Sequence, residues 1–227
     1  MYAIPQQTLP VFTKLYTVPV DVRRTLLVSF FLVLLAAPSL SANQPLIICY
    51  GDSITAGYNL PAGQSFPDAL RRDLDKAGYH YKVDNMGTPG ATSKDAVESL
   101  HSVLGLHPAV VILEFGGNDG LRGLPLEQTR RNLDSILTTL DAAHIKVLLA
   151  GITLPPNYGP DYIRQFDAIF HDLAASHHIA SVPMIYKNLV HVPNTIQPDG
   201  IHPTAKGSEI IATTLLPVLK PMLHKAR

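Results

Sequence analysis

Short apolar runs alternate with amphipathic segments from Leu46 onward, and this alternation strongly constrains the fold. The runs of strand length are Leu46–Tyr50, Tyr81–Val83, Ala109–Phe115, Val147–Ile152 and Ile179–Val182. Between and after them, within 66–74, 96–104, 133–140, 163–173 and 210–219, apolar residues recur every three or four positions, the spacing of a helix face. Strands that are apolar throughout are buried on both faces. We therefore predict an α/β fold, a flavodoxin-like three-layer α/β/α sandwich with a five-stranded parallel sheet.

Composition supports one domain over residues 45–223. The 227-residue chain is 46% hydrophobic, enough for a substantial core, and no repeat or linker interrupts the pattern. Lys+Arg and Asp+Glu both number 18, so no basic field favours nucleic acid as a partner. The single cysteine, Cys49, excludes an intramolecular disulfide and a Cys-rich zinc site. Because Cys49 stands in an apolar strand, we expect it to be a small buried side chain.

Residues 1–42 have the features of a secretory signal peptide. Arg23 and Arg24 precede an apolar run over 26–37, and small residues follow at Ser41 and Ala42. The apolar run is shorter than the roughly 20 residues that span a bilayer, which favours a signal peptide. The alternative is that the segment is not cleaved and serves as a membrane anchor. We expect this segment to be cleaved and the mature protein to be exported, periplasmic or secreted.

Polar clusters follow four of the predicted strands. Residues 51–53, with the sequence Gly-Asp-Ser, follow the first strand, 85–90 follow the second, and 116–119, Gly-Gly-Asn-Asp, follow the third. Asp199 and His202 follow the fifth strand and precede the last predicted helix. In open α/β sheets, ligands bind beyond the carboxyl ends of the strands. We therefore expect all of these polar residues to meet at one edge of the sheet.

Ser53, His202 and Asp199 have the residue types that hydrolysis through a serine requires. A serine hydroxyl is a weak nucleophile unless a base removes its proton, and His202 is the candidate base. The Asp199 carboxylate can accept from one ring nitrogen and leave the other facing Ser53. The alternatives are structural: Asp52 and Ser53 cap the helical turn that follows, and Asp199 begins an ordinary turn.

Asn118 and Gly90 are candidate donors to the oxyanion of a tetrahedral intermediate. A side-chain amide at Asn118 can bind such an oxygen together with backbone N–H groups, here those of Ser53 and Gly90. Glycine at position 90 permits unusual backbone dihedrals and leaves room for substrate. Gly87 is the rival for this role, and a simple turn is the alternative for both segments.

In order and spacing these segments resemble the GDSL family, the SGNH hydrolases, named for their Ser, Gly, Asn and His. Ile54 stands where the family name has Leu, and the resemblance covers nearly the whole chain after residue 42. Segments 117–123 and 154–159 also resemble bacterial thioesterase I/lysophospholipase L1/arylesterase enzymes. The resemblance implies hydrolysis of acyl esters and thioesters without metal or cofactor, through an acyl-enzyme intermediate. It assigns catalysis to Ser53, Asp199 and His202 and the oxyanion hole to Ser53, Gly90 and Asn118.

Apolar residues after the third and fourth strands are candidates to line an acyl groove. They are Leu121, Leu124, Leu154, Pro155 and Tyr158. Simple loop packing is the alternative for each of them. From these side chains we predict a preference for medium or long acyl chains.

The expected partners are small molecules: acyl esters, lysophospholipids or thioesters. We expect the protein to be a monomer and, because such substrates include lipids, to make transient contact with membrane lipid. A carbohydrate O-acetylesterase is the first alternative, but the chain has no tryptophan to serve as a sugar platform. A non-catalytic lipid-binding protein is the second, and it would not need the four polar segments. We expect no metal, because no His-Glu-x-x-His motif occurs.

Overall fold

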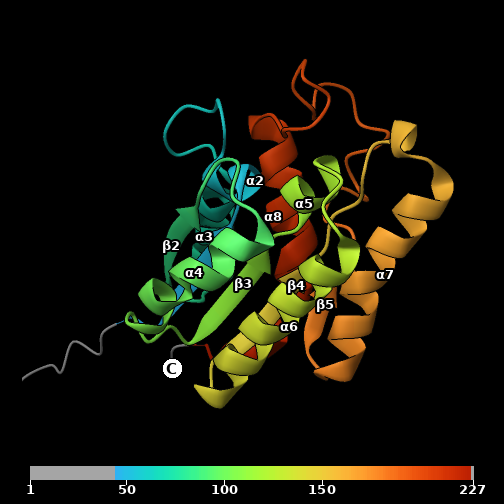
Figure 1. Ribbon diagram of the computed structural model, residues 1–227. Coiled ribbons are helices and arrows are strands. Elements are labelled where there is room, and N and C mark those ends of the chain that lie inside the picture. Colours follow the sequence, from blue (N-terminus) through green and yellow to red (C-terminus); the bar gives the residue numbers. More distant parts are fainter. Residues whose placement is uncertain (1–43, 226–227) are drawn as a thin grey trace, which may run out of the picture. The chain divides into compact units, whose positions relative to one another are not determined.

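The computed structural model describes residues 44–225, so the predicted signal peptide lies outside the described residues. A five-stranded parallel sheet forms the centre of this region, with the strand order β2-β1-β3-β4-β5 (Figure 1). The strands are β1 (Leu46–Gly51), β2 (Lys82–Gly87), β3 (Val110–Glu114), β4 (Lys146–Ala150) and β5 (Ala180–Val182). This is the flavodoxin-like order, and the predicted fold class is confirmed.

Helices cover both faces of the sheet within residues 44–225. They are α2 (Ser53–Ala56), α3 (Phe66–Lys76), α4 (Ser93–Leu104), α5 (Gly117–Leu121), α6 (Leu126–Ala142), α7 (Pro160–Ser176) and α8 (Ala205–Leu219), with short 3-10 turns η1 (Pro156–Tyr158) and η2 (Lys220–Met222). Helices α3 and α8 pack together on one face, and α4, α6 and α7 lie on the other (Figure 1). The five longer helices coincide with the five segments that show helical spacing.

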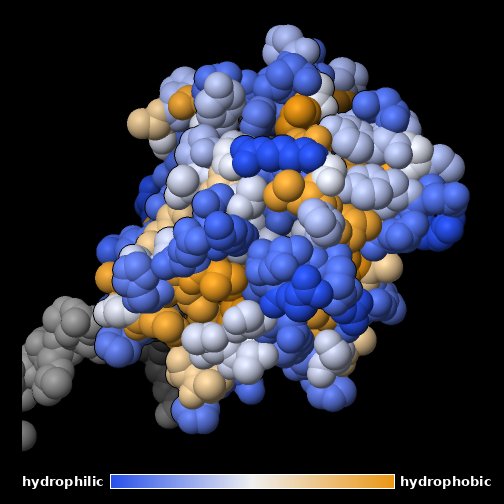
Figure 2. Space-filling view, in the orientation of Figure 1, coloured by the Kyte–Doolittle hydropathy of each residue, from blue (hydrophilic) through white to orange (hydrophobic). Residues whose placement is uncertain are grey.

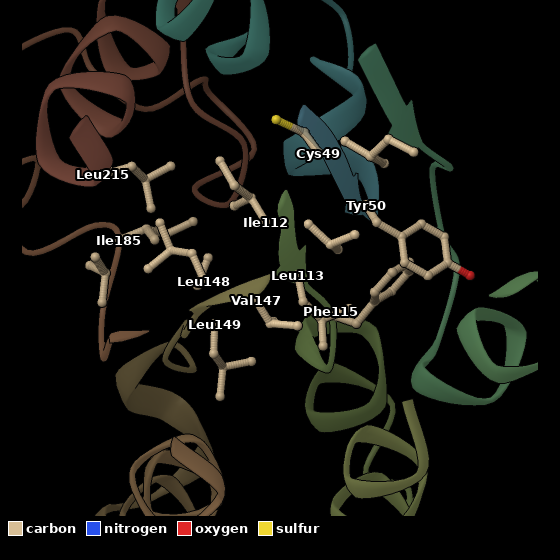
Figure 3. Close-up of a cluster of buried hydrophobic side chains, with 14 of the residues drawn as sticks. Cys49, Tyr50, Ile112, Leu113, Phe115, Val147, Leu148, Leu149, Ile185 and Leu215 are labelled. Carbon is tan, nitrogen blue, oxygen red and sulfur yellow. The ribbon is translucent and has the colours of Figure 1, made fainter. Parts of the chain in front are cut away.

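Successive side chains along each strand point to opposite faces of the sheet, and each set packs in the core on its own face. Cys49, Ile112 and Leu148 are in register on adjacent strands, and their side chains lie on the α8 side of the sheet, toward Leu215 (Figure 3). The next residue on each strand, beginning with Tyr50, points to the opposite face. The Cys49 side chain is fully buried, and this burial raises the pKa of its thiol, as expected for a packing residue rather than a reactive thiol.

Capping boxes fix where α3 and α4 begin. The Thr92 hydroxyl accepts from the Asp95 N–H at 3.4 Å, and the Asp95 carboxylate accepts from the Thr92 N–H at 2.8 Å. Ser65 and Asp68 make the same pair of bonds at the start of α3. Each box satisfies two backbone N–H groups at a helix start. The box at α4 also fixes the end of the polar segment that follows β2.

Strand β2 is longer than predicted and takes in part of the segment expected to be a loop. Asn85 lies within the strand, where its side-chain amide donates to the Thr55 carbonyl at 2.8 Å. Gly87 ends the strand against α2, and a Cβ there would lie 2.1 Å from the Ala56 nitrogen. Gly87 therefore permits close packing of α2 on β2.

The view of the molecule that shows α4 and α6 is covered mainly by hydrophilic side chains, with hydrophobic ones visible between them (Figure 2). This is the usual surface of an α/β domain, because helices turn their apolar stripe toward the sheet. Within residues 44–225, no helix has the length and apolar character needed to cross a bilayer.

Candidate active site

Ser53 is presented by the turn from β1 into α2. Strand β1 ends at Gly51, and Asp52 caps α2 by accepting from the Ile54 N–H at 3.0 Å. Ser53 is the first residue of α2, and 8% of its surface is exposed. The capping interpretation of this segment is therefore correct for Asp52, and the cap itself brings the serine to the carboxyl edge of the sheet.

His202 and Asp199 meet Ser53 at this edge although they lie about 150 positions further along the chain. The His202 Nε2 atom is 2.8 Å from the Ser53 hydroxyl, and its Nδ1 atom is 2.7 Å from the Asp199 Oδ2 atom. The other carboxylate oxygen of Asp199 accepts from the N–H groups of Ile201 and His202 at 2.9 and 3.0 Å. The structure therefore brings the three predicted residues into one hydrogen-bonded array.

Asp199 is held in its ionised form. Burial opposes ionisation, but the hydrogen bonds from the backbone and from the His202 ring outweigh it, so the pKa of Asp199 lies below its ordinary value. A carboxylate in this position can orient the imidazole and stabilise its cation.

Two residues that the sequence did not reveal hold the His202 segment against α2. The Gln197 side-chain amide donates to the carbonyls of Tyr58 and Pro203, both at 2.8 Å, and its backbone N–H donates to the His202 carbonyl at 2.8 Å. The Tyr58 ring lies against the His202 ring, with centroids 4.7 Å apart. The signal in the sequence was slight, because a glutamine two residues before Asp199 has many ordinary roles.

Asn118, in α5 after β3, lies beside Asp52. Its Nδ2 atom donates to the Asp52 Oδ2 atom and to the Ala91 carbonyl, at 3.0 Å each. Gly117 makes this approach possible, since a Cβ there would lie 3.3 Å from the Asp52 Oδ2 atom. Both amide hydrogens are therefore already donated, and an oxyanion at this site would replace one of the two acceptors.

Asp119 anchors the same turn. It is 2% exposed and accepts from the Ser93 N–H at 2.8 Å and from the Thr129 hydroxyl at 3.2 Å. These bonds join α5 to α4 and α6, and they fix the position of Asn118.

Gly90 lies next to this group but not in the cavity that Ser53 lines. Its φ is +79°, and its carbonyl accepts from the Arg122 guanidinium at 2.8 Å. It lines a neighbouring hollow of about 510 Å³ together with Ala91, whose carbonyl contacts Asn118. The segment around Gly90 is thus joined to the site through Asn118.

A cavity of about 550 Å³ lies beside the Ser53 hydroxyl. Its polar lining includes Asp52, Ser53, Asn118 and His202. Its apolar lining comes from α2, from the end of α5 and from the loops after β4 and β5, and includes Ile54, Leu121, Ile152, Leu154, Pro155, Pro156, Met184, Val190, Ile196 and Ile201. The cavity can hold an apolar chain next to the hydroxyl.

Three of the five residues predicted to bind substrate line this cavity, namely Leu121, Leu154 and Pro155. Leu124 and Tyr158 do not line it. Leu124 is 38% exposed, and the Tyr158 hydroxyl donates to the Leu121 carbonyl at 2.7 Å, which makes Tyr158 a support for the cavity wall.

Four of the apolar lining residues that were not predicted come from the irregular segment 183–203. They are Met184, Val190, Ile196 and Ile201. Val190 is 62% exposed, an unusual position for a large apolar side chain. Apolar residues in this segment do not recur with a helical or strand period, so the sequence could not predict which way their side chains point. Only the nearness of the segment to Asp199 in the sequence indicated a role in the active site.

No group of three or more His, Cys, Asp or Glu side chains suited to a metal ion occurs among the described residues. The array instead offers a hydroxyl, an imidazole, a carboxylate and an amide. A parallel α/β sandwich with this array at the carboxyl edge of its sheet defines the SGNH class of hydrolase.

Comparison with known proteins gives the family. Residues 49–210 match the GDSL-like lipase/acylhydrolase family. The chain is 39% identical to esterase TesA of Pseudomonas aeruginosa, over 88% of this chain and 100% of that protein. It is 36% identical to thioesterase 1/protease 1/lysophospholipase L1 of Escherichia coli K12, over 86% and 91%. The crystal structure of AlinE4, an SGNH-hydrolase family esterase, superposes with a TM-score of 0.67 and 35% identity, over 80% and 97%. The chain therefore belongs to the GDSL-like lipase/acylhydrolase family and is a hydrolase.

Proposed function

We propose that this hydrolase cleaves acyl esters and thioesters through an acyl-enzyme intermediate on Ser53. The observation that carries the proposal is the continuous array from the Ser53 hydroxyl through both His202 ring nitrogens to Asp199, with distances of 2.8 and 2.7 Å. Relatives named esterase, thioesterase and lysophospholipase support this range of substrates.

In the first half of the reaction, the His202 Nε2 atom takes the Ser53 hydroxyl proton as the serine oxygen bonds to the acyl carbon. The carbonyl π electrons move to the oxygen, which becomes the oxyanion. When the intermediate collapses, the bond from carbon to the leaving oxygen or sulfur breaks, and His202 gives its proton to the leaving group. In the second half, His202 deprotonates a water molecule that attacks the acyl carbon, and Ser53 regains its proton as it leaves.

The oxyanion is bound by the Ser53 N–H and the Asn118 amide, and the Gly90 N–H is the third predicted donor, from the neighbouring segment that Asn118 joins to the site through the Ala91 carbonyl. Ser53 supports this role because, as the first residue of α2, its N–H lacks an acceptor within the helix. Asn118 binds the oxyanion by exchanging its bond to the neutral Ala91 carbonyl, while Asp52 keeps the other amide hydrogen. Charge development on the oxyanion favours this exchange, because a charged acceptor makes the stronger hydrogen bond.

Medium or long acyl chains fit the apolar lining of the cavity at Leu121, Leu154 and Val190. A series of p-nitrophenyl acetate, butyrate, octanoate and palmitate tests this preference, and we expect octanoate or palmitate to give the highest kcat/KM. A sharp preference for acetate over the other three esters would contradict the proposed substrate class and favour an O-acetylesterase.

The decisive experiment replaces the nucleophile. Ser53→Ala should lose p-nitrophenyl ester turnover, by roughly 10³-fold or more, and should no longer be labelled by a fluorophosphonate. A Ser53→Ala protein that turns over the ester at the wild-type rate would refute the mechanism. Tm measured in parallel shows whether the variant is folded.

We also propose that the protein is exported, on the basis of the charged, apolar and small-residue pattern over 1–42. Mass spectrometry of the protein from its native host should find a new N-terminus near residue 42. An intact chain confined to the cytoplasm would contradict export.

A further inference from the structure

A carboxyl group with no assigned role lies directly behind the candidate active site. Glu114 is the last residue of β3, and none of its surface is exposed. Its Oε2 atom accepts from the Thr55 hydroxyl at 2.8 Å and from the Asp52 N–H at 3.3 Å. Its Oε1 atom is buried and has no hydrogen-bond partner among the described residues. Such a group needs an explanation, because an unpaired buried polar atom costs stability.

Gly51 provides the space that this carboxyl group occupies. A Cβ at position 51 would lie 2.7 Å from the Glu114 Oε2 atom and 2.0 Å from the Thr55 hydroxyl. Gly51 and Glu114 are also in register on β1 and β3. The glycine of the Gly-Asp-Ser segment thus leaves room for a glutamic acid from the neighbouring strand.

From Glu114 a chain of contacts leads to the oxyanion donor. Glu114 contacts the Asp52 backbone and interacts with its carboxyl group. Asp52, 2% exposed, uses its Oδ2 atom to accept from the Asn118 amide at 3.0 Å. An amide has a nitrogen end and an oxygen end of similar size, and only the nitrogen end can bind an oxyanion. The acceptors at Asp52 and Ala91 place the nitrogen end correctly.

Two adjacent buried carboxyl groups without a cation cannot both be ionised. The other titratable groups that face the pair are His202 and Tyr186, and no Lys or Arg among residues 44–225 forms an ion pair with either carboxyl group. Asp52 has two N–H donors, from Ile54 and Asn118, each at 3.0 Å. Glu114 has one unpaired oxygen and is wholly buried. The proton therefore belongs on Glu114 and the charge on Asp52.

We propose that Glu114 is a positioning residue for ester hydrolysis: as a neutral acid it leaves the single negative charge of the pair on Asp52, which orients the Asn118 amide. This inference rests on the proposed function. Burial and the nearby Asp52 raise the pKa of Glu114 well above its ordinary value, which agrees with a neutral acid. Burial raises the pKa of Asp52 to about 6, so Asp52 is charged at neutral pH.

Three proteins test the inference: the wild type, Glu114→Gln, which keeps a neutral polar group of the same shape, and Glu114→Met, which keeps the volume alone. We expect Glu114→Met to lower kcat for p-nitrophenyl butyrate about tenfold or more with KM nearly unchanged. Methionine leaves the charge on Asp52 but removes the acceptor of the Asp52 N–H, so Asp52 no longer holds Asn118, a donor that acts in the transition state, in place. Glu114→Gln should restore kcat to within about threefold of wild type, with the acid limb of its pH profile unmoved. Wild-type kcat in folded Glu114→Met would overturn the inference.

The pH profile separates a neutral from an ionised Glu114. If Glu114 were ionised, Glu114→Gln would remove a negative charge beside Asp52, and the acid limb of kcat would move to lower pH. That shift, or a tenfold loss of kcat in Glu114→Gln, would overturn the inference even if Glu114→Met failed to fold.

A double variant tests whether Glu114 acts through Asn118. In an Asn118→Ala background, Glu114→Met should cost little further kcat, and a full additive loss would contradict the proposed route. Ser53→Ala is run beside these proteins, because its unimpaired turnover would refute the proposed function itself, whatever the Glu114 variants do.

Discussion

Replacing Glu114 with glutamine should change how the stability of the protein depends on pH. The folded protein holds a proton on Glu114 because burial, followed by the nearby Asp52, raises its pKa well above its ordinary value of 4.5. The unfolded chain releases that proton once the pH exceeds the ordinary value. The stabilising contribution of this group is therefore fully present below pH 4.5 and is lost as the pH rises toward the raised pKa of the folded state.

The size of the effect follows from the number of protons involved. One proton held by the folded state but not by the unfolded state changes the free energy of unfolding by about 1.4 kcal/mol per pH unit. Between about pH 5 and about pH 7 the wild type should therefore lose stability relative to Glu114→Gln, whose amide does not titrate, by up to about 2.5 kcal/mol, the limit reached when the folded state keeps the whole proton. For a domain of this size this corresponds to a relative change in Tm of roughly 5–10 °C.

Urea denaturation of both proteins at the two pH values measures this difference directly, since all other titrating groups are shared. Glu98→Gln is a matched control, because this glutamate is exposed on α4 and its ion pair with Lys94, at 3.7 Å, also lies at the surface. We expect Glu98→Gln to follow the wild type. An identical pH dependence of unfolding in the wild type and Glu114→Gln would refute a neutral Glu114.

Two further substitutions test the support of the imidazole. Asp199→Asn should place an amide nitrogen where a carboxylate oxygen now lies, 2.7 Å from the Nδ1 atom of His202, and so favour the wrong tautomer of the ring. We expect kcat to fall about 10²- to 10⁴-fold with little change in Tm. A wild-type kcat in this variant would contradict the role of Asp199. Gln197→Met should remove the two hydrogen bonds that the Gln197 side chain donates, to the Tyr58 and Pro203 carbonyls. We expect the free energy of unfolding to fall by about 1–3 kcal/mol and kcat to fall with it, as measured by urea titration and ester kinetics. A loss of stability without a loss of kcat would show that Gln197 supports only the fold.

The fold could be predicted from the sequence because each element carries a local signal. A strand such as β3 is apolar up to its last residue, Glu114, because both of its faces are covered, and each long helix turns one apolar stripe to the sheet. Strand β2 was predicted too short because it lies at the edge of the sheet and is only partly buried. Its polar residues therefore followed no apolar pattern.

The active-site array could be placed because Ser53, Asn118 and His202 stand at strand ends or before a helix, and the topology brings those positions together. The cavity lining was only partly predictable, since segment 183–203 has no period that would orient its side chains. Gln197 was missed for a related reason, because its hydrogen bond to the Tyr58 carbonyl spans 139 positions of the chain.

Glu114 was missed because it ends an apolar run and was read as part of a buried strand. A carboxyl group is costly at such a position unless a partner or a proton accompanies it, and that cost was the available signal.

Glu114 also shows that the Gly-Asp-Ser segment has a structural role and a chemical role at the same time. Gly51 leaves room for Glu114, and Asp52 caps α2 with one oxygen and holds Asn118 with the other. A cap formed by an uncharged residue would start the helix equally well but would leave the amide without an anionic acceptor. The cap is therefore part of the candidate oxyanion site, and its charge depends on the buried proton behind it.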